Sequence, residues 1–372
     1  MNSLRNSLLI VTTLTRLLRR TLERMSNPLD VRTYRASRGR VIPIAVIMAV
    51  AACGVAYAAY RIIDKQILKT GPETRVNFLL NVPYGNFSLY SGTKSTQLAL
   101  LRVVTEDMEE DPPMHVRQYI SKDNTGTVKV TLGTDEGMVI PEKPLAHQSY
   151  HASTGFSLAS AGAVRTDWGE TIYEPPVQRS NFVSNASMLS DDDERYQLNV
   201  TRDIPVSISA QFGFGESMMD WTGIKLTSAY VETGASNARV SVRAMNQYDM
   251  SGCKISAGIG SFMMDGICNL NANRFEFSGG VGYYKLFFNG KLAKNLDAVV
   301  EVGMGNVSMD IPPDAGRVQV YYDENMFSTF NFKGLNKRRD GYATSVGFDQ
   351  SKAPILTLRL SSGMGKMEVR YK

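Results

Sequence analysis

A glycine turn recurs through the C-terminal half of the chain at a nearly fixed interval. Each copy is a Gly-x-Gly unit or a degenerate form of it, and the first five copies lie 21 to 24 residues apart. A period of about 20 residues is typical of proteins built from stacked coils, in which each unit buries its apolar face against its neighbours. The six copies are Gly213-Phe-Gly215, Gly234-Ala-Ser236, Gly258-Ile-Gly260, Gly280-Val-Gly282, Gly303-Met-Gly305 and Gly363-Met-Gly365.

Apolar residues alternate on both sides of each turn, which predicts two short strands per coil with one inward face. Aligning the copies on their first glycine gives equivalent inward pairs. Before the turn the pairs are Ala229 and Val231, Cys253 and Ile255, Phe275 and Phe277, Ala298 and Val300, and Leu358 and Leu360. After the turn they are Ala238 and Val240, Phe262 and Met264, Tyr284 and Leu286, Val307 and Met309, and Met367 and Val369.

The glycines themselves indicate corners. A tight corner between two strands needs residues that accept a positive φ or a close backbone approach. A phosphate-binding loop would instead need a glycine-rich turn that leads into a helix. No copy is followed by a helical pattern. We therefore interpret the repeat as part of a scaffold.

A twenty-residue segment without charge, residues 41–60, predicts one transmembrane helix, since a helix of that length spans roughly 30 Å. Residues 1–40 contain nine arginines and only two acidic residues. The positive-inside rule therefore places residues 1–40 in the cytoplasm and the C-terminal part across the membrane. The remaining 332 residues hold 32 basic and 34 acidic residues, which disfavours a folded body that binds nucleic acid.

Two processing alternatives compete with a retained anchor. The string Val50-Ala51-Ala52-Cys53 fits a lipoprotein cleavage box, with lipidation at Cys53, and Ala56-Tyr57-Ala58 fits a signal peptidase site. The apolar segment continues past Cys53, which favours a retained single-pass anchor. Translation from Met25 instead of Met1 would leave a conventional short N-terminal region, so the start also stays open.

The first 24 residues form a second membrane signal, because leucines and arginines fall on opposite sides of a helical wheel. Such a helix would lie on the anionic cytoplasmic leaflet and contact membrane lipid. The arginines expected at the membrane surface are Arg5, Arg16, Arg19 and Arg20. An unstructured basic extension explains the same residues, and a mitochondrial transit peptide is a lesser alternative.

Beyond the anchor, short alternating segments separated by Gly, Asn, Asp and Ser predict an all-β body. Residues 61–72 are predicted as a polar stalk, 73–204 as a divergent β region, and 205–372 as the repeat domain. An insertion at about 316–355 interrupts the repeat before its last copy.

Several strings in the repeat region carry a family resemblance. They are Thr233-Gly-Ala-Ser, Gly258-Ile-Gly-Ser-Phe, Asn271-Ala-Asn273, Gly279-Gly-Val-Gly282, Val302-Gly-Met-Gly305 before Ile311-Pro312, and Leu356-Thr-Leu-Arg-Leu-Ser-Ser-Gly-Met-Gly365. This region, about 205–372, resembles the bacterial toast-rack domain, an adhesin-like β-solenoid family of phage-shock and Lia-type cell-envelope stress proteins. A weaker echo lies around Tyr84 to Leu101.

The resemblance implies a right- or left-handed single-stranded β-solenoid, which in this chain would follow the transmembrane helix predicted at 41–60. It also implies a bacterial inner-membrane protein whose ectodomain is periplasmic or extracytoplasmic and works as a non-enzymatic scaffold, protein-interaction or sensing module. The partner would be an unknown protein or another copy of the chain. A self-assembling envelope subunit and, less favoured, a carbohydrate-binding β-helix are the alternatives.

No catalytic, cofactor or metal site emerges from the residues. His147 and His151 have suitable spacing for zinc, but no helix signal or third ligand accompanies them, and His115 stands apart. The acidic segments 106–111 and 191–194 lack the pattern of a calcium loop. Cys253 and Cys268 could pair in an oxidising compartment, but the inward position of Cys253 favours two separate thiols.

The insertion is our candidate interaction surface, because the repeat does not need it. It brings basic and aromatic residues together in a short stretch. The residues we expect at this surface are Phe327, Phe330, Phe332, Lys337, Arg338 and Arg339. A decorative or disordered loop explains the same stretch equally well.

Overall fold

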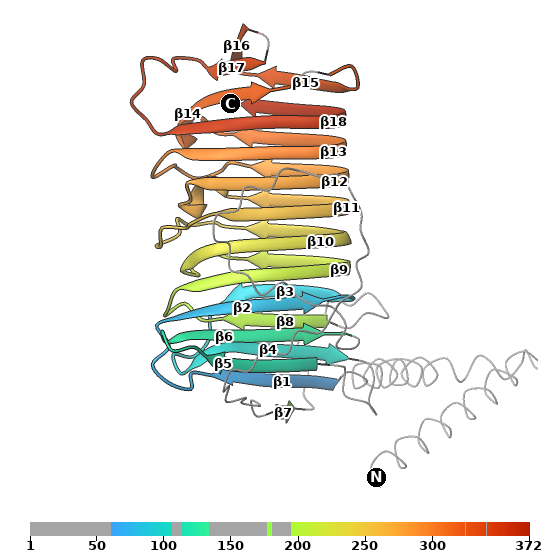
Figure 1. The fold of residues 1–372 in the computed structure, drawn as a ribbon, viewed down its shortest axis with the longest axis vertical. Coiled ribbons are helices and arrows are strands. Elements are labelled where there is room, and N and C mark those ends of the chain that lie inside the picture. Colours follow the sequence, from blue (N-terminus) through green and yellow to red (C-terminus); the bar gives the residue numbers. More distant parts are fainter. Residues whose placement is uncertain (1–60, 106–113, 134–176, 181–194, 324, 340) are drawn as a thin grey trace, which may run out of the picture. The chain divides into compact units, whose positions relative to one another are not determined.

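The computed structural model describes residues 61–105, 114–133, 177–180, 195–323, 325–339 and 341–372, all within the unit Tyr60–Lys372. Strands dominate these residues, and helical turns are limited to the 3-10 helices η1 (Ile267–Leu270) and η2 (Pro313–Ala315) (Figure 1). The prediction of an all-β body is confirmed. Within these ranges no helix is long and apolar enough to cross a bilayer, and the predicted transmembrane helix at 41–60 lies outside them.

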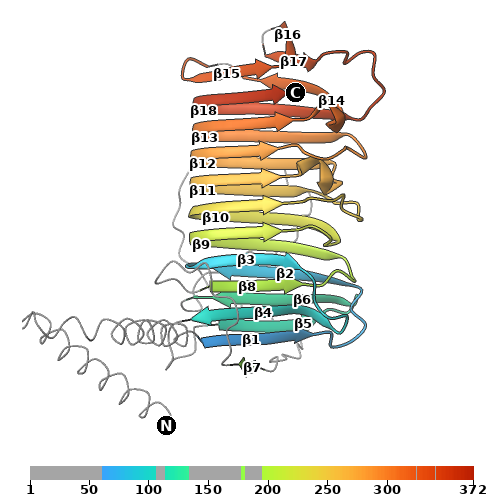
Figure 2. The same cartoon turned by 180° about the vertical axis from the view of Figure 1, so that it is seen from behind.

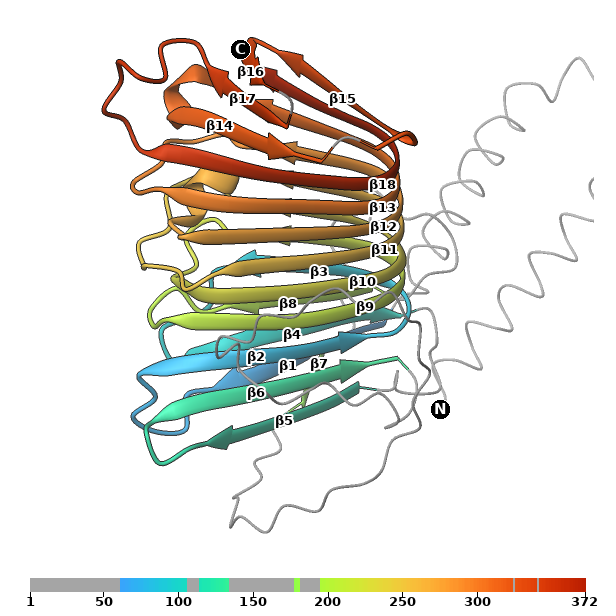
Figure 3. The ribbon, with the colours of Figure 1, turned by 45° about the horizontal axis from the view of Figure 1, so that its top comes forward.

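Six long strands carry the glycine turns and form successive coils. Each strand bends at its turn, so that one arm lies before the corner and one after it (Figure 3). Neighbouring strands pair in parallel along both arms. The strands are β9 (Val206–Asp220), β10 (Leu226–Ser241), β11 (Cys253–Asp265), β12 (Arg274–Phe287), β13 (Leu296–Ile311) and β18 (Ile355–Tyr371).

The register of these strands confirms the alignment made from the sequence. Cys253 lies opposite Ala229 on one side and Phe275 on the other, and Phe262 lies opposite Ala238 and Tyr284. All of the predicted inward residues are buried. Their side chains fill the space between the two arms, so the core continues without interruption from coil to coil.

The corners bring backbone against backbone. At Gly260 the backbone has a φ of 129°, and a Cβ atom there would lie 2.3 Å from the carbonyl oxygen of Ser236 in the preceding coil. Gly305 and Gly365 show the same combination. Glycine is therefore required at these corners both because φ is positive and because the backbone of the neighbouring coil lies so close. Ser236, which replaces glycine in the degenerate copy, has no positive φ.

The connectors between coils are tied by a buried amide. The Nδ2 of Asn246 donates to the carbonyl oxygens of Leu226 at 2.8 Å and Leu270 at 3.1 Å. Its Oδ1 accepts from the backbone N–H of Leu226 at 3.2 Å. One side chain thus joins backbone groups of β10 and η1 on either side of its own connector.

The N-terminal end of the stack consists of strands from the predicted divergent region and stalk. The strands β2 (Arg75–Val82) and β3 (Asn86–Ser91) form a further coil beside β9 (Figure 2). The corner of this coil is the segment between the two strands, Pro83-Tyr84-Gly85. The strands β6 (Thr125–Leu132) and β8 (Arg195–Val200) pair in parallel with the outer side of that coil. The antiparallel strands β5 (Met114–Ile120), β4 (Gln97–Thr105), β1 (Arg61–Leu68) and β7 (Val177–Ser180) follow.

Two expectations need correction at this end. Residues 61–68 of the predicted polar stalk are a strand, because Ile63 and Ile67 alternate with polar residues and enter the core. The prediction of a single-stranded β-solenoid also holds for only part of the fold, because the strands at this end pair in antiparallel fashion.

The insertion closes the opposite end of the stack. Strand β14 (Arg317–Tyr322) pairs in parallel with the first arm of β18, and β15 (Ser328–Lys333) pairs with the second arm. The strands β16 (Leu335–Arg339) and β17 (Tyr342–Ser345) are antiparallel, and β17 also pairs with β14. We call residues 317–345 the cap. Strand β18, although last in the chain, therefore lies between β13 and the cap.

Both cysteines of the described region are free thiols inside the core, as their separate positions in the repeat suggested. Burial raises the pKa of the Cys253 thiol, and burial followed by the charge of Asp314 raises the pKa of Cys268 to about 12. Because the thiolate is the reactive form, neither thiol is expected to be reactive in the native state.

In a Cys53→Ala background, we therefore expect Cys253 and Cys268 to react with a maleimide at least about 100-fold more slowly in the folded than in the unfolded protein. Mass spectrometry of the labelled protein with and without denaturant measures this ratio. Rapid labelling of either thiol under native conditions would contradict its placement in the core.

Candidate interaction surfaces

The cap gathers the predicted aromatic residues but turns two of them inward. The ring centroids of Phe330 and Phe332 lie 5.3 Å and 4.7 Å from that of Tyr322, and both side chains pack against the core. Phe327 behaves differently, because 63% of it is exposed beside the last corner. Phe330 and Phe332 thus hold the cap on the stack, and Phe327 is presented to the surroundings.

The predicted basic residues lie together on β16 and are all exposed. The Lys337 ammonium lies 5.6 Å from the ring centroid of Tyr322, and the Arg339 guanidinium lies 5.6 Å from that of Tyr342. Arg338 donates through Nε to Oγ1 of Thr344 at 3.1 Å, and its guanidinium lies 3.6 Å from the exposed carboxylate of Asp349. Aromatic faces attract cations, so these contacts fix the directions of the basic side chains. The cap consequently displays an ordered basic edge.

A second surface runs along the corners. The middle residue of each glycine turn points outward, and strand register places these residues in one row across the coils. The larger ones are 45% to 62% exposed. We call this row the corner ridge: Tyr84, Phe214, Ile259, Val281, Met304 and Met364. Ala235 occupies the remaining rung, and Phe327 extends the row beside Met364.

The ridge begins with an ordered aromatic pair. The rings of Tyr84 and Phe214 are stacked with centroids 6.0 Å apart and an angle of 8° between their planes. Its other rungs follow the strand spacing of about 4.8 Å, so the apolar side chains form a continuous strip. This surface was not among the predictions from the sequence, although the middle residues of the turns (Phe, Ile, Val, Met and Met) were a signal for it.

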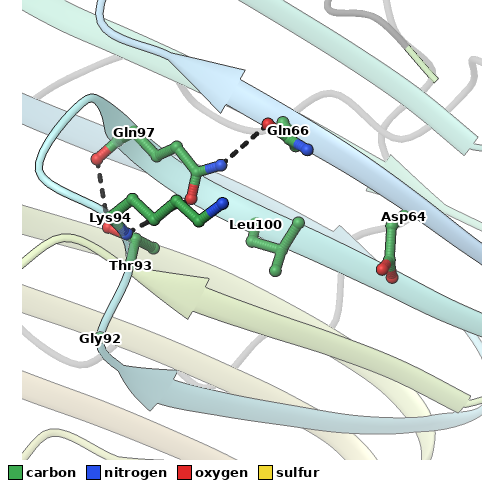
Figure 4. A pocket seen from close by; sticks show the side chains of 7 residues that line it. All are labelled: Asp64, Gln66, Gly92, Thr93, Lys94, Gln97 and Leu100. Atoms are coloured by element: carbon green, nitrogen blue, oxygen red, sulfur yellow. Dashed lines mark hydrogen bonds between the residues drawn. The ribbon is translucent and has the colours of Figure 1, made fainter. Parts of the chain in front are cut away.

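A shallow pocket of about 470 Å³ lies near the N-terminal end, lined by residues of β1 and β4 and by the turn before β4 (Figure 4). Its single carboxylate, Asp64, accepts two hydrogen bonds from Arg102, at 2.8 Å and 2.9 Å. Gln97 donates to Gln66 at 2.9 Å across the same surface. The lining thus offers hydrogen bonds but no pair of acidic groups for general acid–base chemistry.

A carbohydrate-binding β-helix would use acidic side chains on its strands, but Glu276 and Asp310 are engaged in ion pairs. Glu276 forms ion pairs with Arg274 and Lys254, and Asp310 does so with Arg370 and Lys372. The described residues contain no group of three or more His, Cys, Asp or Glu that could hold a metal ion. His115 lies on β5, whereas His147, His151 and both acidic segments lie outside the described residues, as do the membrane-surface arginines Arg5, Arg16, Arg19 and Arg20.

Residues 175–265 match the family described as the N-terminal domain of toast_rack, DUF2154. These residues run from β7 to β11 and include three of the glycine corners. The resemblance to the toast-rack domain seen in the sequence is therefore confirmed for these residues. No curated protein matches the chain.

Two crystal structures are similar to the chain at low identity. A candidate cell adhesion protein from Clostridium sporogenes is 14% identical, with a TM-score of 0.36 over 84% of this chain and 100% of its own. A candidate adhesin from Bacteroides fragilis is 12% identical, with a TM-score of 0.33 over 83% of this chain and 96% of its own. With TM-scores this low, neither structure serves as evidence for the fold or function of this chain.

Proposed function

We propose that the chain is a membrane-anchored, non-enzymatic envelope protein whose stacked coils act as a scaffold that binds another protein through the cap. The observation that carries this proposal is the ordered basic edge of β16, with Lys337, Arg338 and Arg339 exposed together. The core-packed rings of the cap support this edge from below, so little side-chain freedom would be lost on binding.

The chemistry of this edge favours an acidic protein surface as partner. Guanidinium groups bind carboxylates through two parallel hydrogen bonds, and arginine is enriched at protein interfaces. Basic residues on an edge strand also discourage pairing with strands of other chains. That protective role and partner binding make different predictions for a charge reversal.

We expect the variant Arg338→Glu with Arg339→Glu to lose its partner when the tagged full chain is captured from native membranes. The matched control is Lys122→Glu with Lys94→Glu, which reverses two exposed charges at the end of the stack opposite to the cap. Quantitative mass spectrometry should show at least a tenfold loss of a specific acidic protein in the cap variant alone. Equal recovery from both variants would contradict the proposal and leave edge protection as the role of these charges.

The anchor is proposed from the uncharged segment 41–60, with the N-terminus in the cytoplasm and Arg5, Arg16, Arg19 and Arg20 on membrane lipid. The ectodomain would then face the periplasm or the extracytoplasmic side. Deleting residues 41–60 should release the chain from alkaline-washed membranes. Release of the intact chain by the same wash would contradict a retained anchor.

Association with phage-shock or Lia-type stress proteins remains a prediction from the family resemblance.

A further inference from the structure

We propose that two copies of the chain pair side by side and antiparallel through the corner ridge. This pairing goes beyond the proposed function, because it uses the corners of the coils and not the basic edge on β16. Three properties of the ridge indicate that a second copy of the chain covers it: its apolar area, the order of its side-chain sizes and the charges near its two ends.

The exposed area is large for a single chain. Six ridge side chains and Phe327 are each about half exposed or more. At on the order of 100 Å² each, they present roughly 700 Å² of contiguous apolar surface. The largest patch on a typical monomer is about 300–600 Å², and a standard interface buries about 800 Å² on each partner. The ridge is therefore large enough to need a partner and to support a dimer.

The sizes along the ridge are complementary to the same ridge in reverse. A two-fold axis between Ile259 and Val281 sets Ile259 against Val281 of the partner subunit. It also sets Ala235, the smallest rung, against Met304 of the partner subunit, and Phe214 against Met364 of the partner subunit. An interface across a two-fold axis must complement itself in this way.

The charges beside the ridge select the antiparallel arrangement. The residue after each corner is neutral in the middle coils, where Asn237, Ser261, Tyr283 and Asn306 occupy it. It is Glu216 at one end and Lys366 at the other, each exposed. Antiparallel pairing brings Glu216 next to Lys366 of the partner subunit at both ends, whereas parallel pairing would leave these opposite charges at opposite ends of the pair. Within its own chain Lys366 lies 3.3 Å from Glu368, on the adjacent outward position.

Disulfide crosslinking of the full chain in its native membranes tests this arrangement. In a Cys53→Ala background, the double variant Glu216→Cys with Lys366→Cys should form a covalent dimer on oxidation, at least fivefold more than either single variant. The two positions are five rungs apart within one chain, about 24 Å, which is too far for an internal disulfide. Non-reducing electrophoresis separates the dimer from the monomer.

Adding Ile259→Glu and Val281→Glu should abolish this crosslink, since four carboxylates would then meet at the two-fold axis. Val346→Glu, an exposed apolar position outside the ridge, is the matched control and should retain it. Thermal unfolding of both variants shows whether the fold is kept. Crosslinking by Glu216→Cys alone would indicate parallel pairing and overturn the proposal. Absence of any crosslinked dimer, as for a ridge that lies on lipid or on another protein, would overturn it as well.

Discussion

Replacing Gly260 by alanine is expected to destabilise the stack by about 2–4 kcal/mol and to lower its melting temperature by roughly 5–10 °C. The new Cβ would lie 2.3 Å from the carbonyl oxygen of Ser236, and the backbone φ of 129° disfavours any side chain. The conflicting atom belongs to the backbone of the preceding coil, so it cannot move without disturbing the ladder between β10 and β11. Thermal unfolding monitored by circular dichroism measures the effect.

Gly252, just before β11, supplies the control for this substitution. A Cβ there would meet its nearest neighbour, the carbonyl oxygen of Arg274, at 3.8 Å, and the backbone has no positive φ. Gly252→Ala should therefore leave stability within about 0.5 kcal/mol or raise it slightly. If both variants melted at the same temperature, close stacking of the corners would not be the reason for the glycine repeat.

Phe277→Ala is expected to cost about 3–5 kcal/mol, since it would empty the centre of the core. The Phe277 ring is buried between Phe262 and Tyr284, with ring centroids 5.3 Å and 5.1 Å away. These three rings come from the two arms of adjacent coils, so their contact joins both layers of the stack. Chemical denaturation of the purified chain measures the loss.

Two further variants separate packing from the mere loss of an aromatic ring. Phe277→Leu keeps most of the volume and should cost less than half as much. Tyr248→Ala removes a ring that is 41% exposed on a connector and should cost under about 1 kcal/mol. Equal losses for Phe277→Ala and Tyr248→Ala would mean that residue 277 does not face the interior.

The repeating part of the fold could be predicted from the sequence because its pattern is local. Alternation around each glycine turn identifies the inward face, and the fixed spacing identifies which residues lie opposite one another. The spacing alone thus aligns Cys253 with Phe275, and the two residues do pair in register.

The two ends of the stack depend on pairings between distant segments, which spacing does not reveal. The gap between Gly305 and Gly363 shows that the repeat is interrupted. It does not show whether the inserted strands lie between β13 and β18 or on the far side of β18. The coil of β2 and β3 is hard to recognise in the sequence because its corner reads Pro83-Tyr84-Gly85. Only the second glycine of the Gly-x-Gly unit is kept there, as Gly85. Val76 nevertheless continues the core row next to Val206.

The candidate surfaces show the same division. Clustering of basic and aromatic residues predicted the cap, but only the structure shows that Phe332 supports it from inside and that Arg338 lies outside. The corner ridge could not be recognised from the glycines of the turn, which report only the backbone. The residue between them is the one that a stack of corners displays.

Photo-crosslinking in native membranes tests most directly whether this chain is a protein-binding scaffold. A photoreactive amino acid is placed at Arg338 on the cap or, as control, at Lys122 on the exposed turn between β5 and β6. We expect a discrete adduct with another protein from position 338 and none from position 122. An equal absence of adducts at both positions, in membranes that contain the intact chain, would contradict a protein-binding cap.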